Sequence, residues 1–388
     1  MTTIAAAFGM LVGLGSSGIA AQAAPAAPAA PDATFNTLLA TYTALADGGG
    51  SACIGGTPST TGATTTCTIV QPQPGHTGRN VAVCVQNNTP GTIQVCDIMQ
   101  TNTTSNNYAL VIQRRSQNGG AVQEATQFAD VEQLNGTGSN FLGEFQLITQ
   151  TTGDANRDDP SQTNNQYLGS DSDETQQTAT AGGSNFALLA QRSRQFGSAE
   201  RAAQTQNSNQ VGRLNQVDTP GGRSLNLVSQ EQLQHLEGDG PQTQTVDPRC
   251  CTNQGTNPND SFNIRQQTVQ EGGPQAAQDA KTVGTCQTTG KCTVIQSSTQ
   301  QGTTTTNQCG PASFCAAAIT CTKGVCTPIP ACFASDRNLC PPPPPCQPTV
   351  CPQPTPLCPP FCNLPLASLT GTRGLSAMMH EPTFARAT

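Results

Sequence analysis

Amide side chains recur at strand-like intervals between residues 94 and 150, and this spacing most constrains what the chain can fold into. The stretch carries one series twice: Gln, five residues, Gln, six residues, Asn, five residues, Gln, three residues, Gln. Residues six apart face the same side of a β-strand, whereas on a helix they face nearly opposite sides. The series therefore predicts a strand, a turn and a return strand, with an amide at each end of both strands.

Apolar residues occupy the same face between the amides, as at Cys96, Ile98, Ala109 and Val111. Related copies extend from residue 65 to residue 300, about seven in all, with extra length in polar segments such as 151–182. Self-similarity of this kind is typical of a stacked array in which each unit buries its face against its neighbours. We therefore predict an all-β fold: a β-solenoid of stacked strand–turn–strand repeats followed by a disulfide- and proline-rich C-terminal tail. Residues 151–182 are expected to form a long outward loop.

The repeated amides are the candidate functional residues, as a structural ladder. In an in-register stack each Gln or Asn can donate to one neighbouring copy and accept from the other, for about 1 kcal/mol net per bond. Glu144 and Arg265 fall where inward apolar residues are expected, which indicates irregular rungs or a slip of register there. The predicted ladder consists of Gln71, Asn80, Gln86, Gln94, Gln100, Asn107, Gln113, Gln127, Gln133, Asn140, Gln146, Asn185, Gln191, Gln210, Gln216, Asn226 and Gln232.

Composition narrows the class of protein. Only 35% of the 388 residues are hydrophobic and 4% aromatic, so a large conventional core is not expected. Charged residues make up 11% and the formal net charge is −7, which argues against a nucleic-acid partner because no basic patch is present to bind phosphates. No catalytic motif, cofactor-binding loop or paired metal-ligand spacing occurs. We expect no enzyme activity, no cofactor and no metal site.

The chain divides into five segments by composition. Residues 1–23 resemble a signal peptide ending in Ala21-Gln22-Ala23, and no other run is apolar enough to predict a membrane span in the mature chain. Residues 24–52 form an Ala/Pro linker and N-terminal segment, in which 33–46 fits either a short helix or a first strand. The repeat array covers 53–308, a Cys/Pro-rich module 309–362, and a flexible tail 363–388.

Eighteen cysteines indicate an oxidising compartment, so disulfides are preferred over zinc. Cys67, Cys84 and Cys96 face inward by the parity of the amides. Neighbouring strands about 4.8 Å apart suit a disulfide better than sheets about 10 Å apart. This reasoning favours Cys67 with Cys96, leaving Cys53 and Cys84 for each other or for another partner. A second candidate set of four lies near the end of the array: Cys250, Cys251, Cys286 and Cys292.

The amide spacing resembles the curlin repeat of curli-type bacterial amyloid subunits. The matching positions are Gln94, Gln100, Asn107 and Gln113, then Gln127, Gln133, Asn140 and Gln146, then Gln210, Gln216, Asn226 and Gln232. The family's leading Ser is mostly Gln here, its Gly after the first Gln is absent, and the copies are longer and contain cysteine. The resemblance implies stacked strand–turn–strand arches and self-association.

Together these features predict a secreted structural or adhesive surface protein, exposed at the cell surface or in a biofilm matrix and able to self-assemble into fibres. Expected partners are further copies of the chain or other surface and matrix proteins. The alternative is a monomeric, capped β-solenoid that binds an extracellular polysaccharide or another surface ligand.

Overall fold

The computed structural model of the chain describes residues 31–71, 78–152, 161–169, 175–198, 203–219 and 221–250 without interruption. It then describes 254–255, 257, 260–273, 275–284, 287–288, 290–301, 304–307, 314–322 and 325–329. The predicted signal peptide and flexible tail lie outside the described residues.

Most described residues belong to two large sheets. Sheet A has ten strands, in the order β1 (Ala52–Ile54), β4 (Asn80–Asn87), β6 (Asn107–Asn118), β8 (Asn140–Thr151), β11 (Asn185–Ser198), β14 (Ser224–Glu237), β17 (Ser261–Glu271), β21 (Lys291–Gln301), β23 (Phe314–Thr322) and β24 (Val325–Ile329).

Sheet B has twelve strands. Its main path is β2 (Thr57–Thr61), β3 (Thr64–Gln71), β5 (Ile93–Asn102), β7 (Val122–Asn135), β9 (Ser161–Leu168), β12 (Gln204–Gly212), β15 (Gln242–Cys250), β18 (Ala276–Ala280) and β22 (Thr304–Asn307). The shorter strands β10 (Thr175–Ala179), β13 (Leu214–Asp218) and β19 (Val283–Gly284) extend it. A separate pair is formed by β16 (Gln254–Gly255) and β20 (Gln287–Thr288).

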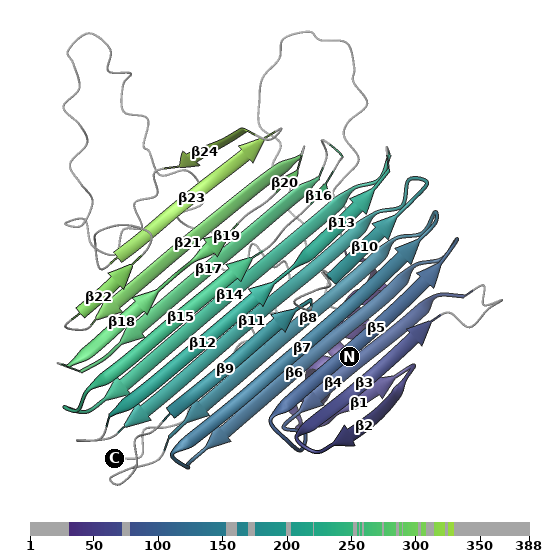
Figure 1. The fold of residues 1–388 in the computed structure, drawn as a ribbon. Coiled ribbons are helices and arrows are strands. Elements are labelled where there is room, and N and C mark those ends of the chain that lie inside the picture. Colours follow the sequence, from purple (N-terminus) through teal and green to yellow (C-terminus); the bar gives the residue numbers. More distant parts are fainter. Residues whose placement is uncertain are drawn as a thin grey trace, which may run out of the picture.

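The chain alternates between the two sheets, and each new strand joins its sheet beside the strand before it. Figure 1 shows the strands side by side in chain order, from the purple N-terminal strands to the green C-terminal ones. From β3 to β21 all pairings in the two large sheets are parallel, and equivalent residues of successive copies lie opposite each other, as Gln94 lies opposite Gln127. The predicted all-β class is confirmed, with parallel sheets.

The space between the sheets is lined by small and medium apolar residues alternating with amides. It includes Ile69, Ala82, Val111, Ala129 and Leu142, all essentially inaccessible to solvent. Because the side-chain period of a strand is two, every second residue contributes to this layer and the others face outward.

Of the two structures considered for residues 33–46, the chain adopts the helix. Helix α1 (Ala33–Asp47) is the one helix among the described residues, and the Asp32 carboxylate caps it by accepting from the Phe35 amide at 2.9 Å. Its buried face packs on the outer side of sheet A, where the Phe35 ring lies 5.6 Å from Phe186 and 6.1 Å from Phe141. The cluster of Tyr108, Phe141, Phe145 and Phe186 therefore lies under α1, whereas Phe262 lies between the sheets.

The expected loop at 151–182 is wrong in part, because it contains β9 and β10. In β9 the inward positions are Gln162, Asn164, Gln166 and Leu168, so amides take the places where a strand ordinarily carries apolar residues. A search for apolar alternation does not detect such a strand. Within the described chain, no helix combines the length and apolarity that crossing a membrane requires.

Candidate functional site

The inward amides of equivalent strands form continuous hydrogen-bonded columns, a column being the set of amides at one register position of one sheet. Three columns run through sheet B: Gln71, Gln100, Gln133, Gln177 and Gln216; Gln94, Gln127, Gln166 and Gln210; and Gln123, Gln162, Gln206, Gln244 and Gln278. Three run through sheet A: Asn80, Asn107, Asn140 and Asn185; Gln86, Gln113, Gln146, Gln191, Gln230 and Gln266; and Gln117, Gln150, Gln195, Gln234, Gln270 and Gln300.

Every column has one polarity. Each Gln Nε2 donates to the Oε1 of the preceding copy, as Gln133 donates to Gln100 at 2.8 Å. The Asn column runs the other way, since Asn107 Nδ2 donates to the Oδ1 of Asn140, in the next copy, at 2.9 Å. Aligned amides polarise one another in such chains, which strengthens each bond.

The second N–H of the amide usually reaches a backbone carbonyl of the facing sheet. Gln133 in β7 donates to the Phe141 carbonyl of β8 at 3.2 Å, and Gln146 in β8 donates to the Tyr167 carbonyl of β9 at 2.9 Å. The same amides therefore link neighbouring strands within a sheet and hold the two sheets together. These hydrogen bonds explain why the amides can be buried, because each unpaired polar group would otherwise cost about 1–3 kcal/mol.

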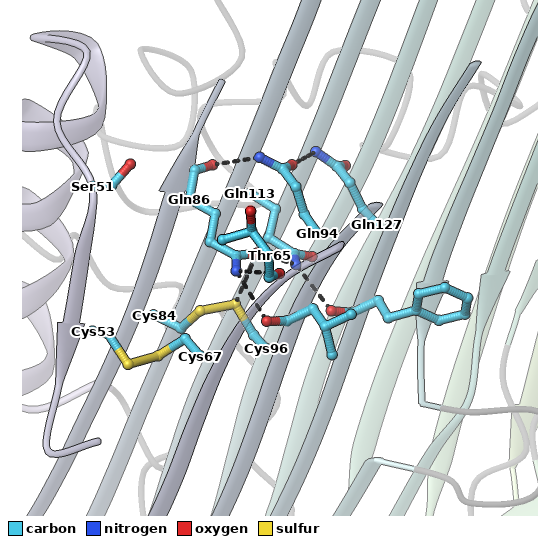
Figure 2. Close-up of a disulfide and its surroundings, with 12 residues drawn as sticks. Ser51, Cys53, Thr65, Cys67, Cys84, Gln86, Gln94, Cys96, Gln113 and Gln127 are labelled. Atoms are coloured by element: carbon cyan, nitrogen blue, oxygen red, sulfur yellow. Dashed lines mark hydrogen bonds between the residues drawn. A yellow bond between two sulfur atoms is a disulfide. The ribbon is translucent and has the colours of Figure 1, made fainter. Parts of the chain in front are cut away.

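Fifteen of the seventeen predicted ladder residues lie in these columns, all of them except Asn226 and Gln232. All of the fifteen are buried apart from Gln71, which is partly buried. Figure 2 shows Gln86 and Gln113 beside Gln94 and Gln127, with dashed lines marking hydrogen bonds among the residues drawn.

The predicted register of β14 is wrong by two residues. Ser224 and Gln230, not Asn226 and Gln232, lie opposite Asn185 and Gln191. Both pairs are six apart and a shift of two residues keeps the same face, so strand periodicity alone does not separate them. Asn226 is buried opposite Ala187, and neither of its side-chain polar atoms has a partner among the described residues.

The predicted register is wrong by one residue at Arg265, which was expected at an inward position. In β17 the inward residues are Ile264, Gln266 and Gln270, so Arg265 faces outward and is only partly buried. Burial nevertheless lowers the pKa of its guanidinium.

The predicted ladder omitted the column that begins at Gln123 and the column that begins at Gln117, although the series in residues 94–150 already contained Gln117 and Gln150. A usable signal was present, because Gln followed four residues later by Gln occurs in β7, β8, β9, β11, β12, β14 and β17. Four residues are two strand periods, so both amides of such a pair face inward.

The first four cysteines form two disulfides, but not in the favoured pairing. Cys53 bonds to Cys67, with a Cα–Cα distance of 5.8 Å, and Cys84 bonds to Cys96, with one of 6.1 Å (Figure 2). The pairing of Cys67 with Cys96 is therefore wrong. Those two residues do lie opposite each other in β3 and β5, but neighbours within a parallel sheet point their side chains in the same direction.

Both disulfides cross from one sheet to the other, where the Cβ atoms point toward each other. The premise of sheets about 10 Å apart does not hold here, because small residues such as Ala82 and Ala109 separate them. Cys250 and Cys292 are also disulfide-bonded. Cys251 and Cys286 lie outside the described residues.

Acidic groups are buried at two sites, a single carboxyl and a carboxyl pair. Glu144 lies opposite Val111 and Leu189, and its Oε1 accepts a long 3.5 Å bond from Thr175 while its Oε2 has no partner among the described residues. Burial raises the pKa of Glu144 well above its usual range, and the charge of Asp130 adds to the shift.

The second acidic group is a carboxyl pair. Burial and the neighbouring Asp260 carboxylate raise the pKa of Asp218 to about 7. Asp260 accepts from the backbone amides of Ser224 at 2.8 Å and Asn257 at 3.2 Å, which anchors the turn into β14. Burial raises the pKa of Asp260 as well.

Within the described ranges no group of His, Cys, Asp and Glu residues is arranged to hold a metal ion. Comparison with protein-family models, curated proteins and solved structures gives no match. The resemblance to curlin repeats therefore stays a prediction that rests on residue spacing. The amide columns are the structural feature that bears most directly on function.

Replacing Gln146 by Leu tests the contribution of one column residue. The change leaves the Gln113 Oε1, one Gln191 N–H and the Tyr167 carbonyl without their bonds, so we expect a loss of about 3 kcal/mol or more in the free energy of unfolding. Chemical denaturation followed by circular dichroism measures it. The control is Gln176→Leu, at an outward position of β10, which should change stability by under about 0.5 kcal/mol. Equal effects of the two changes would contradict the role of the columns.

Replacing Glu144 by Gln tests the buried acid. A carboxyl whose pKa is raised on folding stabilises the fold only while protonated, so its contribution is full at low pH and falls as pH rises toward the raised pKa. We expect Glu144→Gln to be more stable than the parent at pH 8 and nearly equal to it at pH 4. Denaturation at both pH values measures this. The exposed control Glu124→Gln should show no such pH dependence, and a gain of equal size at both pH values would refute the explanation.

Proposed function

We propose that the protein is a secreted structural or adhesive surface protein built as a β-solenoid. In this proposal a rung is one strand of sheet B together with the strand of sheet A that follows it, and rungs stack from β3/β4 to β18/β21. The observation that carries the proposal is the set of continuous amide columns. They provide a rigid rod without a large hydrophobic core, which suits a mechanical role outside the cell.

The disulfides support an extracellular location. Two of them join the sheets within the first rungs, and such bonds persist in oxidising compartments. The rod needs no bound ligand to be stable, since the amides that line its interior bond to one another and to backbone carbonyls.

The described ends of the rod favour discrete particles over open-ended fibres. At the N-terminal end β1 pairs antiparallel with β4, and β2 pairs antiparallel with β3. At the C-terminal end of sheet A, β23 and β24 are also antiparallel. A parallel stack cannot be extended in register across such strands, and short, twisted or covered edges are how natural sheets avoid edge-to-edge growth.

Electron microscopy of the oxidised full chain, with thioflavin fluorescence in parallel, tests this function. We expect discrete elongated particles and no fibres. The surface role predicts that external protease removes the protein from intact producing cells and that deletion of its gene reduces their attachment. Fibres with a cross-β repeat would show that the chain is a fibre-forming subunit and not a capped rod. Protection from external protease would exclude the surface role.

A second candidate function is favoured by the outer face of sheet B, which α1 does not cover. Small hydroxyl and amide residues lie there in two adjacent rows, Ser161, Thr205 and Thr243 beside Thr163, Asn207 and Thr245. Next to them Phe128 and Tyr167 stack with ring centroids 4.8 Å apart, and Asn209 Nδ2 donates to the Tyr167 hydroxyl at 3.4 Å. Regular donors and acceptors beside aromatic rings suit binding of a neutral polysaccharide.

Co-sedimentation of the full chain with insoluble cellulose and chitin tests this candidate. If the face binds, Thr205→Lys should reduce the sedimented fraction severalfold, because it places a long cation in the middle of the rows. Thr293→Lys, on the outward face of sheet A, is the control and should bind like the parent. Absence of sedimentation by the parent, or an equal loss in both variants, would reject this function.

A further inference from the structure

The N-terminal end of the array is closed by a short antiparallel element, here called the N-terminal cap (residues 52–61, strands β1 and β2). Strand β1 lies on the edge of sheet A and β2 on the edge of sheet B, so the cap covers both layers at once. It is the only described element that faces the first rung from outside.

The cap forms strand pairs with only part of the two edges. On β3 it pairs with Thr64–Thr68 and leaves Ile69, Val70 and Gln71 without a strand partner on that side among the described residues. On β4 it pairs only with Val83–Val85 of the eight residues from Asn80 to Asn87. All five residues of β2 are exposed, so little apolar burial holds the cap in place.

One disulfide ties the cap to the array. Cys53 of β1 bonds to Cys67 of β3, whereas the second disulfide, Cys84–Cys96, joins β4 to β5 inside the array. Cys53 is partly exposed, and the other three cysteines are buried. Of the two residues in the cap disulfide, Cys53 is therefore the more accessible to a thiol in solution.

We propose that the Cys53–Cys67 disulfide is a latch, and that opening it frees the edges of β3 and β4 to pair with the same edges of a second copy of this chain. The result is a head-to-head dimer with a two-fold axis across the rod. This inference goes beyond the proposed function and depends on the cap alone, not on a surface or adhesive role.

The geometry of the edge selects a second copy as the partner. A two-fold axis perpendicular to the rod brings β3 beside β3 and β4 beside β4, and each pair is then antiparallel. Strands β1 and β2 already pair with these edges in the same antiparallel direction. A second copy also presents two edges at the same separation, so both layers pair together and the pairing extends over the eight residues of each strand.

Opening the latch requires a dithiol reductant. One thiolate of the dithiol attacks the Cys53 sulfur, Cys67 leaves as a thiolate, and the second dithiol sulfur then displaces Cys53. The reductant becomes a cyclic disulfide, and two protons from the dithiol end on Cys53 and Cys67. The two electrons reduce only this bond, and the buried Cys84–Cys96 bond stays closed at low reductant concentration.

The double variant Cys53→Ser with Cys67→Ser tests the proposal in non-reducing buffer. Size-exclusion chromatography with light scattering should give the mass of a monomer for the parent and twice that mass for the variant. The matched control, Cys84→Ser with Cys96→Ser, also loses one disulfide near the first rung but keeps the cap tied, and should remain monomeric. A monomeric cap variant, or a dimeric control, would overturn the proposal.

Spin labels introduced as an unnatural amino acid test the orientation in the dimer. Thr68 on β3 and Ala277 on β18 are exposed and lie six strand spacings apart in sheet B, about 29 Å at 4.8 Å per spacing. A head-to-head dimer predicts label pairs under about 30 Å apart at Thr68 and about 60 Å apart at Ala277. The opposite order would indicate a tail-to-tail dimer and overturn the inference.

If the cap variant does not fold, the parent chain treated with a low concentration of dithiol replaces it. Mass spectrometry after alkylation then establishes that Cys53 and Cys67 alone are reduced. Doubling of the mass supports the latch, and an unchanged mass rejects it. Neither result depends on the outcome of the fibre or surface experiments, so failure of the latch is distinguishable from failure of the proposed function.

Discussion

The buried amide–amide hydrogen bond is the interaction on which the rest of the fold depends. A carboxamide removed from water needs partners for two N–H groups and its oxygen, and here the nearest source is the same residue type in the next copy. Gln146, for example, donates to Gln113 and accepts from Gln191. This requirement fixes the register residue by residue and selects parallel, in-register pairing, since antiparallel neighbours would bring different positions together.

Columns of amides also explain how two sheets pack face to face with so little apolar surface between them. Much of the inward surface is amide, and the remainder is small, as at Ala82, Ala109 and Ala129. The sheets come close enough for Cys84 to bond to Cys96 across the interior. A cluster of large aromatic side chains packs instead between the outer side of sheet A and α1, while Phe262 is the large aromatic residue of the described inter-sheet cluster.

The sequence predicts this fold best where the copies have equal length. From β5 to β8 one interval of 33 residues separates Gln94 from Gln127 and Gln113 from Gln146, and the predicted register there agrees with the structure. The prediction is wrong in β14, because Ser224 replaces the expected Asn and a two-residue shift preserves the face. It also misses β9, where three of the four inward residues are amides. Predicting the disulfide pairing requires the distance between the two sheets, and the spacing of residues along the chain does not give that distance.

The polarity of the Gln columns makes their two ends chemically different. Because each Gln donates toward the N-terminus, the first Gln of a column must find acceptors outside the column. Gln86 does so at the carbonyls of Thr65 and Val95, both at 3.0 Å. At the other end the unmatched group is an acceptor, and the Oε1 atoms of Gln210 and Gln216 have no donor among the described residues. A buried carbonyl oxygen without a donor costs less free energy than a buried N–H without an acceptor. This polarity therefore places the less costly unpaired group where the columns end.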